Sequence, residues 1–597
     1  MRSPARRSLY LCTIAACVAL TLYELANYRV GYISKSALSE QTAQEPIVPP
    51  IPGDQSFRWD KVPQRYPAPS ITSLPAGRAV KLPSIQHDFK KDPESPEVRR
   101  IREAQLEAVK QSFLHAWGGY KKHAWLKDEL APVSGGYKNN FGGWAATLVD
   151  TLDTLWIMDL REEFDEAVAA IDKINFSATE QGELNIFETT IRYLGGFLSA
   201  YDLSGNSLLL QKAVEVGEMV YVAFDTPNRM PILRWDWSSA ASGKPQEAHT
   251  DTLAAEIGSL TLEFTRLSQL SNDPKYYDAI HRVMEQFDIH QNRTKLPGMW
   301  PVVVDAKDLS FLGNSDFTFG AMSDSLYEYL PKQHMMLGGL DERYRKMYGD
   351  AVDVAKQHLL YRPMNKGNQD ILLSGNAHVN DDGQIDLDPQ GQHLTCFVGG
   401  MIGIGAKIFE RDELDIARKL VDGCIWAYES MPTGVMSETF HAVPCSTDCQ
   451  WDEMRWHNGI LKYHDDLQGT TAEHQPLPAG FTEVADSRYL LRPEAIESVF
   501  ILYRITGDTT LQDKAWNMFQ AIEKYTRTDV GHAAIDDVTV SSPPPAKFDS
   551  MESFWTAETL KYFFLIFSHP DLISLDKYVF NTEAHPLKRP QTRSWWN

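Results

Sequence analysis

The sequence has no surplus of basic residues: 58 Lys and Arg stand against 80 Asp and Glu, which gives a formal net charge of −22. A surface of that sign repels nucleic-acid phosphates instead of releasing their counterions, so we expect no nucleic-acid partner. The charge is compatible with a neutral substrate or with a bound cation. Hydrophobic residues make up 43% of the chain and charged residues 23%, which is typical of a folded globular protein.

Familiar nucleotide-binding and hydrolase motifs are also missing. The chain contains no GxGxxG, Walker-type, GxSxG or HExxH pattern. Nucleotide-binding, serine-hydrolase and zinc-protease functions therefore have no support in the sequence. Strand-like patterns are few and short, as in MWPVVVD from Met299.

The N-terminal apolar run falls short of an ordinary membrane span. It extends from about Leu9 to Tyr23 and follows Arg2, Arg6 and Arg7, whereas a span normally needs ~20 apolar residues. The thin membranes of the early secretory pathway accept shorter spans, and no small-x-small cleavage site follows the run. We therefore expect an uncleaved signal-anchor with a cytosolic N-terminus and a lumenal body, a type II arrangement. A cleaved signal peptide is the alternative.

Proline recurs from Pro46 to Pro75, which predicts an extended stem without regular helix. The expected segments are a cytosolic tail (1–7), a signal-anchor (8–28), a Pro-rich stem (29–97) and a folded body (98–590). Sequons at Asn175 and Asn292 fit a lumenal body if they are exposed.

Cysteine is scarce, with six residues in 597. Two lie in the N-terminal apolar run, and the four of the body are Cys396, Cys424, Cys445 and Cys449. Four cysteines allow three connectivities, and their separations suggest Cys396 with Cys424 and Cys445 with Cys449. A zinc site is the alternative, although the spacing is poor for one.

Helical periodicity dominates the chain after about Val98. Apolar residues recur at i, i+3 and i+4 in LLLQKAVEVGEMVYVAFD, LAAEIGSLTLEFTRLSQLS, YYDAIHRVMEQFDI, YRKMYGDAVDVAKQHLL and ESVFILYRITGD, among others. Many helices of similar length without a polar break predict an array of helix pairs, either closed into a toroid or open as a solenoid. We favour the closed form.

Several of these helical segments carry acidic residues inside an apolar pattern. They are Glu188 in NIFETTIRYLGG, Asp324 and Glu328 in DSLYEYL, Glu494 and Glu497 in RPEAIES, Glu558 in ESFWTAETL, and Glu583 in FNTEAHP. For a single acid, an ion pair or a solvated helix face is the simplest explanation. Buried like charges are costly, however, so several together favour a shared pocket. Such a pocket suits a hard cation or acid–base chemistry on a sugar.

Local sequence distinguishes two of these carboxyl groups. Pro493 favours the first turn of a helix, which places Glu494 near the positive end of the helix dipole, and Arg492 precedes it. Both features favour an ionised Glu494, as a general base requires. Glu188 would need burial to keep a proton as a general acid, whereas Arg192 on the same helical face opposes this.

Seven blocks of sequence resemble one known family. They are GGWAATLVDTLDTLWIM, FETTIRYLGGFLSAY, DSLYEYL, HLTCFVGGM, LRPEAIES, MESFWTAETLKYFF and FNTEAHP, in this order between about Gly118 and Pro586. Together they resemble the class I α-mannosidases of glycoside hydrolase family 47, in a fungal-type, membrane-anchored form. The resemblance implies an all-α fold, a catalytic (α/α)7 barrel of paired helices over residues 98–590 with Ca²⁺ at its base.

The resemblance also implies an activity, the inverting exo-hydrolysis of terminal α-1,2-linked mannose from high-mannose N-glycans. Inversion requires an acid and a base about 6.5–9.5 Å apart, with a water between them. Glu188 matches the general acid and Glu494 the base that activates water. Asp324 matches a second catalytic carboxylate whose division of labour with Glu188 stays open, and Glu438 lies close to the chemistry. The matching sugar-binding positions are Arg192, His393, Arg492 and Phe554.

The same resemblance assigns the metal site. Thr582 would bind Ca²⁺ through its hydroxyl and carbonyl oxygens, and the ion would hold two sugar hydroxyls and favour ring distortion. The carboxylates that orient waters around the ion would be Glu438, Glu494, Glu497, Glu558 and Glu583. The resemblance also supports the Cys396–Cys424 disulfide. We expect a monomer that acts on glycoprotein N-glycans at the ER or Golgi membrane.

Two features of this chain stand apart from the family pattern or from the sites assigned above. Met322 stands where the enzymes that remove a single mannose carry Arg, so broader trimming is possible. The segment from Cys445 to Phe481 resembles a long loop whose Trp451, Trp456 and Tyr463 could stack on sugars, although packing within the loop is favoured.

The first alternative function is an ER-degradation-enhancing mannosidase-like factor, against which the expected disulfide and the absence of a long C-terminal extension argue. The second is a catalytically dead mannose-binding lectin, against which the full set of catalytic carboxylates argues.

Overall fold

A computed structural model describes residues 57–445, 449–466 and 477–591. All of these residues belong to one compact unit. The expected cytosolic tail and signal-anchor lie outside the described residues. Within the described ranges, no helix combines the length and the apolar character needed to cross a membrane.

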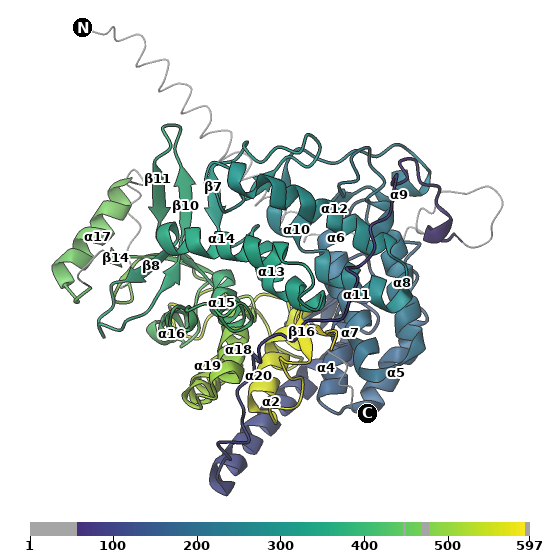
Figure 1. The fold of residues 1–597 in the computed structure, drawn as a ribbon. Coiled ribbons are helices and arrows are strands. Elements are labelled where there is room, and N and C mark those ends of the chain that lie inside the picture. Colours follow the sequence, from purple (N-terminus) through teal and green to yellow (C-terminus); the bar gives the residue numbers. More distant parts are fainter. Residues whose placement is uncertain (1–56, 446–448, 467–476, 592–597) are drawn as a thin grey trace, which may run out of the picture. The chain divides into compact units, whose positions relative to one another are not determined.

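The described chain is built from pairs of helices (Figure 1). The inner helices are α4 (Leu152–Ile157), α7 (Gly195–Ser204), α11 (Thr261–Ser271), α13 (Asp324–Met336), α15 (Phe397–Ile408), α18 (Glu494–Thr506) and α20 (Leu560–Phe567). The outer helices are α2 (Pro96–His123), α5 (Arg161–Ile171), α8 (Ser207–Val222), α12 (Lys275–His290), α14 (Arg343–His358), α16 (Leu414–Ser430) and α19 (Thr510–Thr526).

These helices close into a ring. Each inner helix contacts the next along the chain, from α4 through α7, α11, α13, α15 and α18 to α20. The turn before α20, η5 (Trp555–Thr559), contacts α4, and α20 itself packs against α2. The closed arrangement confirms the expected (α/α)7 barrel and rules out an open solenoid.

Short elements connect the helix pairs. They include the helices α3 (Ala146–Asp150), α6 (Ile186–Glu188), α9 (Trp237–Ala241), α10 (Ala254–Gly258) and α17 (Glu453–Asp466), the 3-10 turns η1 (Trp59–Lys61), η3 (Gln291–Arg293) and η4 (Leu394–Cys396), and the π-helical turns η2 (Thr189–Leu194) and η5. Both π-helical turns precede inner helices, α7 and α20.

The strands are short and antiparallel. Pairs are formed by β1 (Glu129–Ala131) with β2 (Gly136–Lys138), β3 (Leu184–Asn185) with β4 (Arg234–Trp235), β5 (Thr252–Leu253) with β6 (Val303–Val304), and β16 (Tyr578–Phe580) with β17 (Pro586–Lys588). There are also sheets of three strands. One has the order β11 (Ile385–Asp388), β10 (Asn376–Val379), β7 (Asp316–Thr318), and another the order β12 (Gln390–Gln392), β13 (Thr439–Ala442), β15 (Phe481–Asp486). A further sheet has the order β14 (Pro444–Cys445), β8 (Leu360–Pro363), β9 (Leu373–Ser374). In the β16–β17 hairpin Phe580 is paired with Pro586, so residues 581–585 form its connecting turn.

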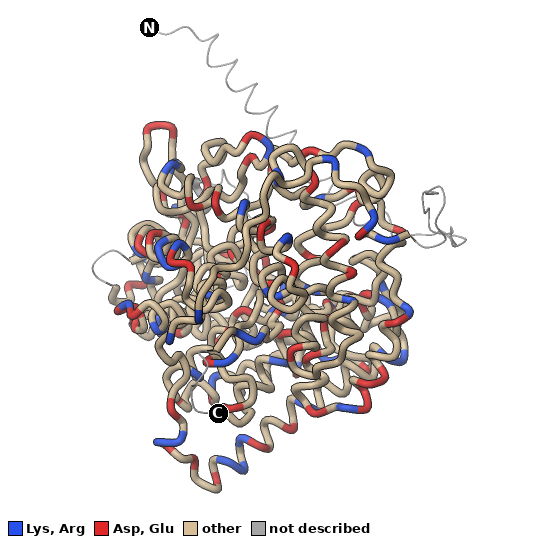
Figure 2. Tube along the Cα trace, turned by 45° about the vertical axis from the view of Figure 1, so that its right-hand side comes forward, with Lys and Arg blue, Asp and Glu red and all other residues tan. Residues whose placement is uncertain are grey.

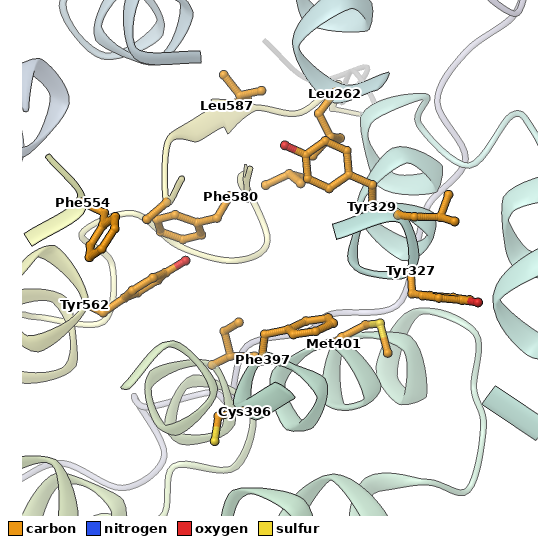
Figure 3. Packing of buried hydrophobic residues seen from close by; sticks show 14 of the residues in the cluster. Leu262, Tyr327, Tyr329, Cys396, Phe397, Met401, Phe554, Tyr562, Phe580 and Leu587 are labelled. Carbon is orange, nitrogen blue, oxygen red and sulfur yellow. The ribbon is translucent and has the colours of Figure 1, made fainter. Parts of the chain in front are cut away.

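Burial separates the inner from the outer helices. The outer helix α12 buries one face, including Ile280, Val283 and Phe287, at the spacing that the sequence predicted. The inner helix α20 (LKYFFLIF) is buried on all sides. Figure 3 shows Tyr562 of α20 beside Phe580 of the hairpin, with ring centroids 5.6 Å apart. The hairpin is therefore part of the core of the barrel.

A glycine allows the 581–585 turn to approach α7. A Cβ atom on Gly195 would lie 2.7 Å from Nδ2 of Asn581 and 2.9 Å from Cδ2 of His585. Because real Cβ atoms do not come so close to other atoms, any larger residue at position 195 would displace the turn. This explains the first glycine of the LGG sequence that follows Arg192.

Residues 57–95, part of the expected stem, run along the barrel. The indole Nε1 of Trp59 donates to the carbonyl of Phe176 at 2.9 Å, and Val80 N donates to the carbonyl of Gly338 at 2.8 Å. Trp59 and Ile85 are buried. This segment therefore contributes to the core, while the division of the whole chain into tail, anchor, stem and barrel stays a prediction.

Both disulfides are present. Cys396 at the end of η4 is bonded to Cys424 of α16, and Cys445 is bonded to Cys449. The prediction of a loop after Cys445 is wrong for residues 453–466, which form α17. Trp456 of that helix donates to the carbonyl of Phe481 at 2.8 Å. For Trp456 this contact agrees with the prediction that the aromatic residues of the segment from Cys445 to Phe481 pack within the segment.

Charged residues are mixed over the described chain. Figure 2 shows acidic and basic positions interspersed, for instance along the long helix α2. Asn175 and Asn292 are both exposed, as glycan acceptors must be.

Candidate active site

The N-terminal ends of two inner helices carry catalytic candidates. Glu494 is the first residue of α18, and its Oε2 lies 2.8 Å from Nδ1 of His393. Burial alone would raise the pKa of Glu494, but the hydrogen bond and charge of His393 and the charge of Arg492 outweigh it and lower the pKa. Pro493 lies just before the helix instead of in its first turn. The expected ionised Glu494 is nonetheless what these surroundings favour.

Asp324 begins α13 and has the opposite environment. Burial raises its pKa to about 7, and the negative charges of Glu328 and Glu494 add to the effect, whereas the Ser325 amide and Arg492 oppose it. The pKa values of these two carboxyl groups are thus shifted in opposite directions. The surroundings favour the ionised form of Glu494 and the protonated form of Asp324.

Glu188 leads into the π-helical turn η2. Its amide donates to Oδ1 of Asn185, which caps the short helix α6, and its Oε2 accepts from Nε of Arg192 at 2.8 Å. The Glu188 side chain is 26% exposed, so it is not buried as a classical low-dielectric acid would require. The second π-helical turn, η5, carries Glu558, and such turns often occur at functional sites.

Arg192 joins this part of the site to the hairpin turn. Its Nη1 donates to Oγ of Ser553 at 3.0 Å and to the carboxylate of Glu583, and lies 3.5 Å from Oδ2 of Asp150. The guanidinium also lies over the ring of Phe554, 5.8 Å from its centroid. Arg192 is therefore fixed by several acidic partners in a buried position.

A second arginine, Arg492, joins another group of the candidate residues. Nε of Arg492 donates to Oε2 of Glu438, whose other oxygen accepts from the Leu490 amide at 3.1 Å. Buried His393 connects the same group through its own amide, which donates to the Glu438 carbonyl at 2.9 Å, and through Nε2, which lies 2.8 Å from the hydroxyl of Tyr428. The structure thus brings Glu438, Arg492, His393 and Glu494 together.

Three further carboxyl groups lie in the interior. Burial raises the pKa of Glu497 to about 8 despite Lys332, whose Nζ lies 3.5 Å from its Oε1. The pKa values of Glu558 and Glu583 are well above the ordinary value, first through burial and then through neighbouring carboxylates. A bound cation would relieve this repulsion.

The turn that carries Thr582 is held by hydrogen bonds from its surroundings. The Thr582 amide donates to the hydroxyl of Tyr329 at 3.2 Å, and that hydroxyl donates to Glu263. Oδ1 of Asn581 accepts from the amides of Glu583 and His585 at 3.0 and 2.8 Å. The turn therefore has a fixed conformation.

Buried charges anchor the end of the same turn. His585 lies 2.8 Å from Asp153 through Nδ1 and 3.0 Å from Asp150 through Nε2. Nζ of Lys561 donates to the Ala584 carbonyl and to Asp153, both at 2.7 Å. Burial would raise the pKa of Asp153, but Lys561 and His585 outweigh it and lower the pKa.

The donor atoms near Thr582 fit a hard cation bound largely by water. Within the described residues, no group of three or more His, Cys, Asp or Glu could hold a metal ion directly. No described residue forms a hydrogen bond with the hydroxyl or the carbonyl of Thr582, so both oxygens are available as ligands. All-oxygen coordination with water is a calcium preference.

Sequence reasoning missed several residues of this site. Asp150, Lys561 and Glu552 lie within blocks of sequence that pointed to the site, but they were not singled out. The criterion that identified Glu494 and Glu497, acids three apart in an apolar helical segment, also describes Asp150 and Asp153. Lys561 has no such signal, because a lysine in a helix is ordinarily solvated.

Comparison with known proteins decides the family. The sequence model of glycosyl hydrolase family 47 matches residues 112–589. The chain belongs to glycosyl hydrolase family 47. It is 36% identical over 479 residues to the human endoplasmic reticulum mannosyl-oligosaccharide 1,2-alpha-mannosidase, a match that covers 80% of this chain and 62% of the human protein. It is 35% identical to a mannosyl-oligosaccharide 1,2-alpha-mannosidase of Arabidopsis thaliana, with 84% and 80% covered.

A solved structure agrees with this assignment. The alpha-1,2-mannosidase from Trichoderma reesei superposes with a TM-score of 0.71 at 29% identity, covering 81% of this chain and 99% of that structure. The family 47 member described here therefore shares its barrel with an experimentally determined mannosidase.

The anchoring of the Thr582 turn can be tested by removing the charge of Lys561. Because Lys561→Met leaves Asp153 buried with only His585 as a cationic partner, we expect the free energy of unfolding to fall by about 3 kcal/mol, as for other broken buried ion pairs. Denaturant unfolding at pH 7 measures the loss.

Lys356→Met is the matched control, since Lys356 is 29% exposed and its partner Glu413 keeps a second cation, Arg411. That variant should lose about 1 kcal/mol or less. Equal losses in the two variants would contradict a special role for the Lys561 anchor.

Proposed function

We propose that this protein is a calcium-dependent exo-α-1,2-mannosidase that trims high-mannose N-glycans on glycoproteins with inversion at the anomeric carbon. Membership of family 47 and the names of the relatives support this function. The single structural observation that carries it is the hydrogen bond of His393 to Glu494, 2.8 Å long, at the start of α18. With Arg492 it lowers the pKa of Glu494 against the effect of burial, whereas burial raises the pKa of Asp324 to about 7. Such divergence is how one site supplies both an acid and a base near neutral pH.

Glu494 is the proposed general base. An ionised carboxylate at the start of α18 can take a proton from water as that water attacks the anomeric carbon. His393 supports this role because its ring is held between Glu494 and Tyr428. The hydrogen bond fixes the direction of the carboxylate and stabilises its charged form.

Asp324 is the proposed proton donor to the departing sugar oxygen, since its surroundings keep it protonated near neutral pH. The family resemblance places the acid at Glu188, which here is bonded to Arg192 and partly exposed. We propose that Glu188 acts in the same pocket as a hydrogen-bond acceptor for Arg192 that orients polar groups around the leaving sugar. Glu438 would hold Arg492 in place beside Glu494.

The remaining residues would bind the sugar and the ion. Phe554 offers an aromatic face to the mannose ring, and Arg192, His393 and Arg492 offer donors to its hydroxyls. Thr582 would hold Ca²⁺, while Glu497, Glu558 and Glu583 would orient its waters. When bound, the ion would supply positive charge that positions two hydroxyls of the mannose and favours a distorted ring.

The proposal extends to the cellular location of the protein and to the number of mannose residues that it removes. The relatives support a place in the secretory pathway, and we propose a type II ER or Golgi membrane protein that acts as a monomer. Met322, two residues before Asp324, is 53% exposed and has a left-handed φ of 74°. Its neutral side chain leaves the entrance without the Arg of single-mannose enzymes, so we expect more than one mannose to be removed.

A time course on a nine-mannose N-glycan tests the function. We expect successive loss of mannose in Ca²⁺, no loss after chelation with EDTA, and a fall in kcat of about 10²-fold or more for Glu494→Gln. Product mass and branch analysis measure these outcomes. Glycan binding without any release by the wild-type protein would contradict the enzyme and favour a lectin, and release only from misfolded glycoproteins would favour the ER-degradation-enhancing alternative.

The contact between His393 and Glu494 predicts a shift in pH dependence. Since His393 lowers the pKa of Glu494, His393→Leu should raise it, and a base must be deprotonated to act. The acidic limb of kcat/KM against pH should therefore move to higher pH in the variant, while activity at pH above the new pKa recovers in part. An unchanged acidic limb with a uniformly lower rate would mean that another group is the base.

A further inference from the structure

Residues 57–95, here called the strap, lie against the barrel and are held there in part by their backbone amides (Figure 1). The two carboxylate oxygens of Asp225 accept from the amides of Arg65 and Tyr66, each at 2.7 Å. The strap precedes residues 112–589, which match family 47. Membership of the family therefore does not explain why this segment is bound to the barrel.

The N-terminal end of the strap carries a buried aromatic residue, Trp59, of which only 4% is exposed. Its indole Nε1 donates to the carbonyl of Phe176 at 2.9 Å. Its ring centroid lies 5.3 Å from that of Trp235 in β4 and 6.5 Å from that of Trp237 in α9. Both of these tryptophans are buried as well. Trp59 therefore packs directly on the segment that contains β4.

Strand β4 leads to a residue of the proposed pocket. It pairs with β3, where Trp235 lies opposite Leu184. Strand β3 ends at Asn185, whose Oδ1 accepts from the amide of Glu188 at 3.2 Å. Helix α6, which this bond caps, is only three residues long and ends at Glu188. A continuous chain of contacts thus runs from Trp59 to the backbone of Glu188.

A buried acid ties the two strands together at the same point. Oε1 of Glu256 lies 2.6 Å from Nη2 of Arg234 in β4 and accepts from Nδ2 of Asn185 in β3 at 3.4 Å. Because protein interiors are close-packed, a displacement of β4 is passed on to its neighbours instead of being absorbed. A shift of β4 would therefore move the Asn185 side chain through the strand pairing and through Glu256.

We propose that the strap positions Glu188, with Trp59 as the positioning residue that acts through the β3–β4 pair. The inference rests on the proposed mannosidase function, in which Glu188 orients polar groups around the leaving sugar. Such a group contributes to the rate only when it is correctly placed, and a misplacement of about 1 Å can lower the rate by about 10²-fold. Loss of the Trp59 ring should therefore slow turnover more than it weakens substrate binding.

Trp59→Ala tests the inference with α-1,2-mannobiose as the substrate in Ca²⁺. We expect kcat to fall about tenfold or more while KM stays within about threefold, because a displaced group loses its effect mainly in the transition state. Trp59→Phe keeps an aromatic ring beside Trp235 and should recover much of the lost kcat. Trp59→Leu keeps apolar volume without a ring, and it provides the same comparison if the alanine variant does not fold.

A double variant tests the route to Glu188. Asn185→Ala removes the cap of α6 and should lower kcat by itself. If Trp59 acts through Asn185, the variant that combines Trp59→Ala with Asn185→Ala should be no slower than the slower single variant, because effects on one shared link do not add. Multiplied losses in the double variant would contradict this route.

Phe89→Ala serves as the control within the strap. The ring of Phe89 packs on that of Tyr503, with centroids 5.4 Å apart, near the C-terminal end of α18 and away from the β3–β4 pair. This variant should keep the kcat and KM of the wild type. Thermal unfolding of every variant sets the assay temperature, so that all are compared in the folded state.

The remaining outcomes are decisive in different ways. An equal fall in kcat for Trp59→Ala and Phe89→Ala would make the strap a general support of the barrel and overturn the inference. A raised KM at an unchanged kcat would also overturn it, since Trp59 would then affect binding of the sugar. A wild-type protein that does not cleave mannobiose would overturn the mannosidase function itself, which separates that failure from failure of the strap inference alone.

Discussion

Burial of many carboxyl groups at the centre of one barrel is the constraint on which the rest of the structure depends. Like charges in a low-dielectric interior repel one another and lose their hydration, so each needs a cation, a hydrogen-bond donor or a proton. Lys332 forms ion pairs with Glu328 and Glu497, and Arg192 with Glu188 and Glu583. Lys561 forms an ion pair with Asp153. The pKa values of Glu497 and Glu558 stay raised, so these carboxyl groups still lack a compensating positive charge, which a bound calcium ion would supply.

The same constraint separates the carboxyl groups into different chemical roles. His393 and Arg492 outweigh burial and lower the pKa of Glu494, whereas burial raises the pKa of Asp324 to about 7, and no described residue forms an ion pair with Asp324. Two inner helices contribute to this, because α13 begins at Asp324 and α18 at Glu494, each near the positive end of its helix dipole. The hairpin turn that carries Thr582 is held by Lys561 and His585.

The sequence predicted the elements that repeat and missed those that are local exceptions. The helix pairs and a helix start at Glu494 follow from apolar spacing and local preference, whereas this spacing left a closed barrel and an open solenoid as alternatives. The π-helical turns at Glu188 and Glu558 could not be predicted, because they arise from packing against neighbouring helices. The segment expected to be a loop after Cys445 contains the helix α17, whose packing against β15 the sequence does not reveal.

The configuration of the released sugar tests the account most directly. If Glu494 activates water across the sugar from a separate acid, hydrolysis of α-1,2-mannobiose by the calcium-loaded protein must first release β-mannose, seen by proton NMR before mutarotation mixes the anomers. Early release of α-mannose would show a covalent intermediate on the protein. That result would contradict the acid–base pair proposed from Asp324 and Glu494.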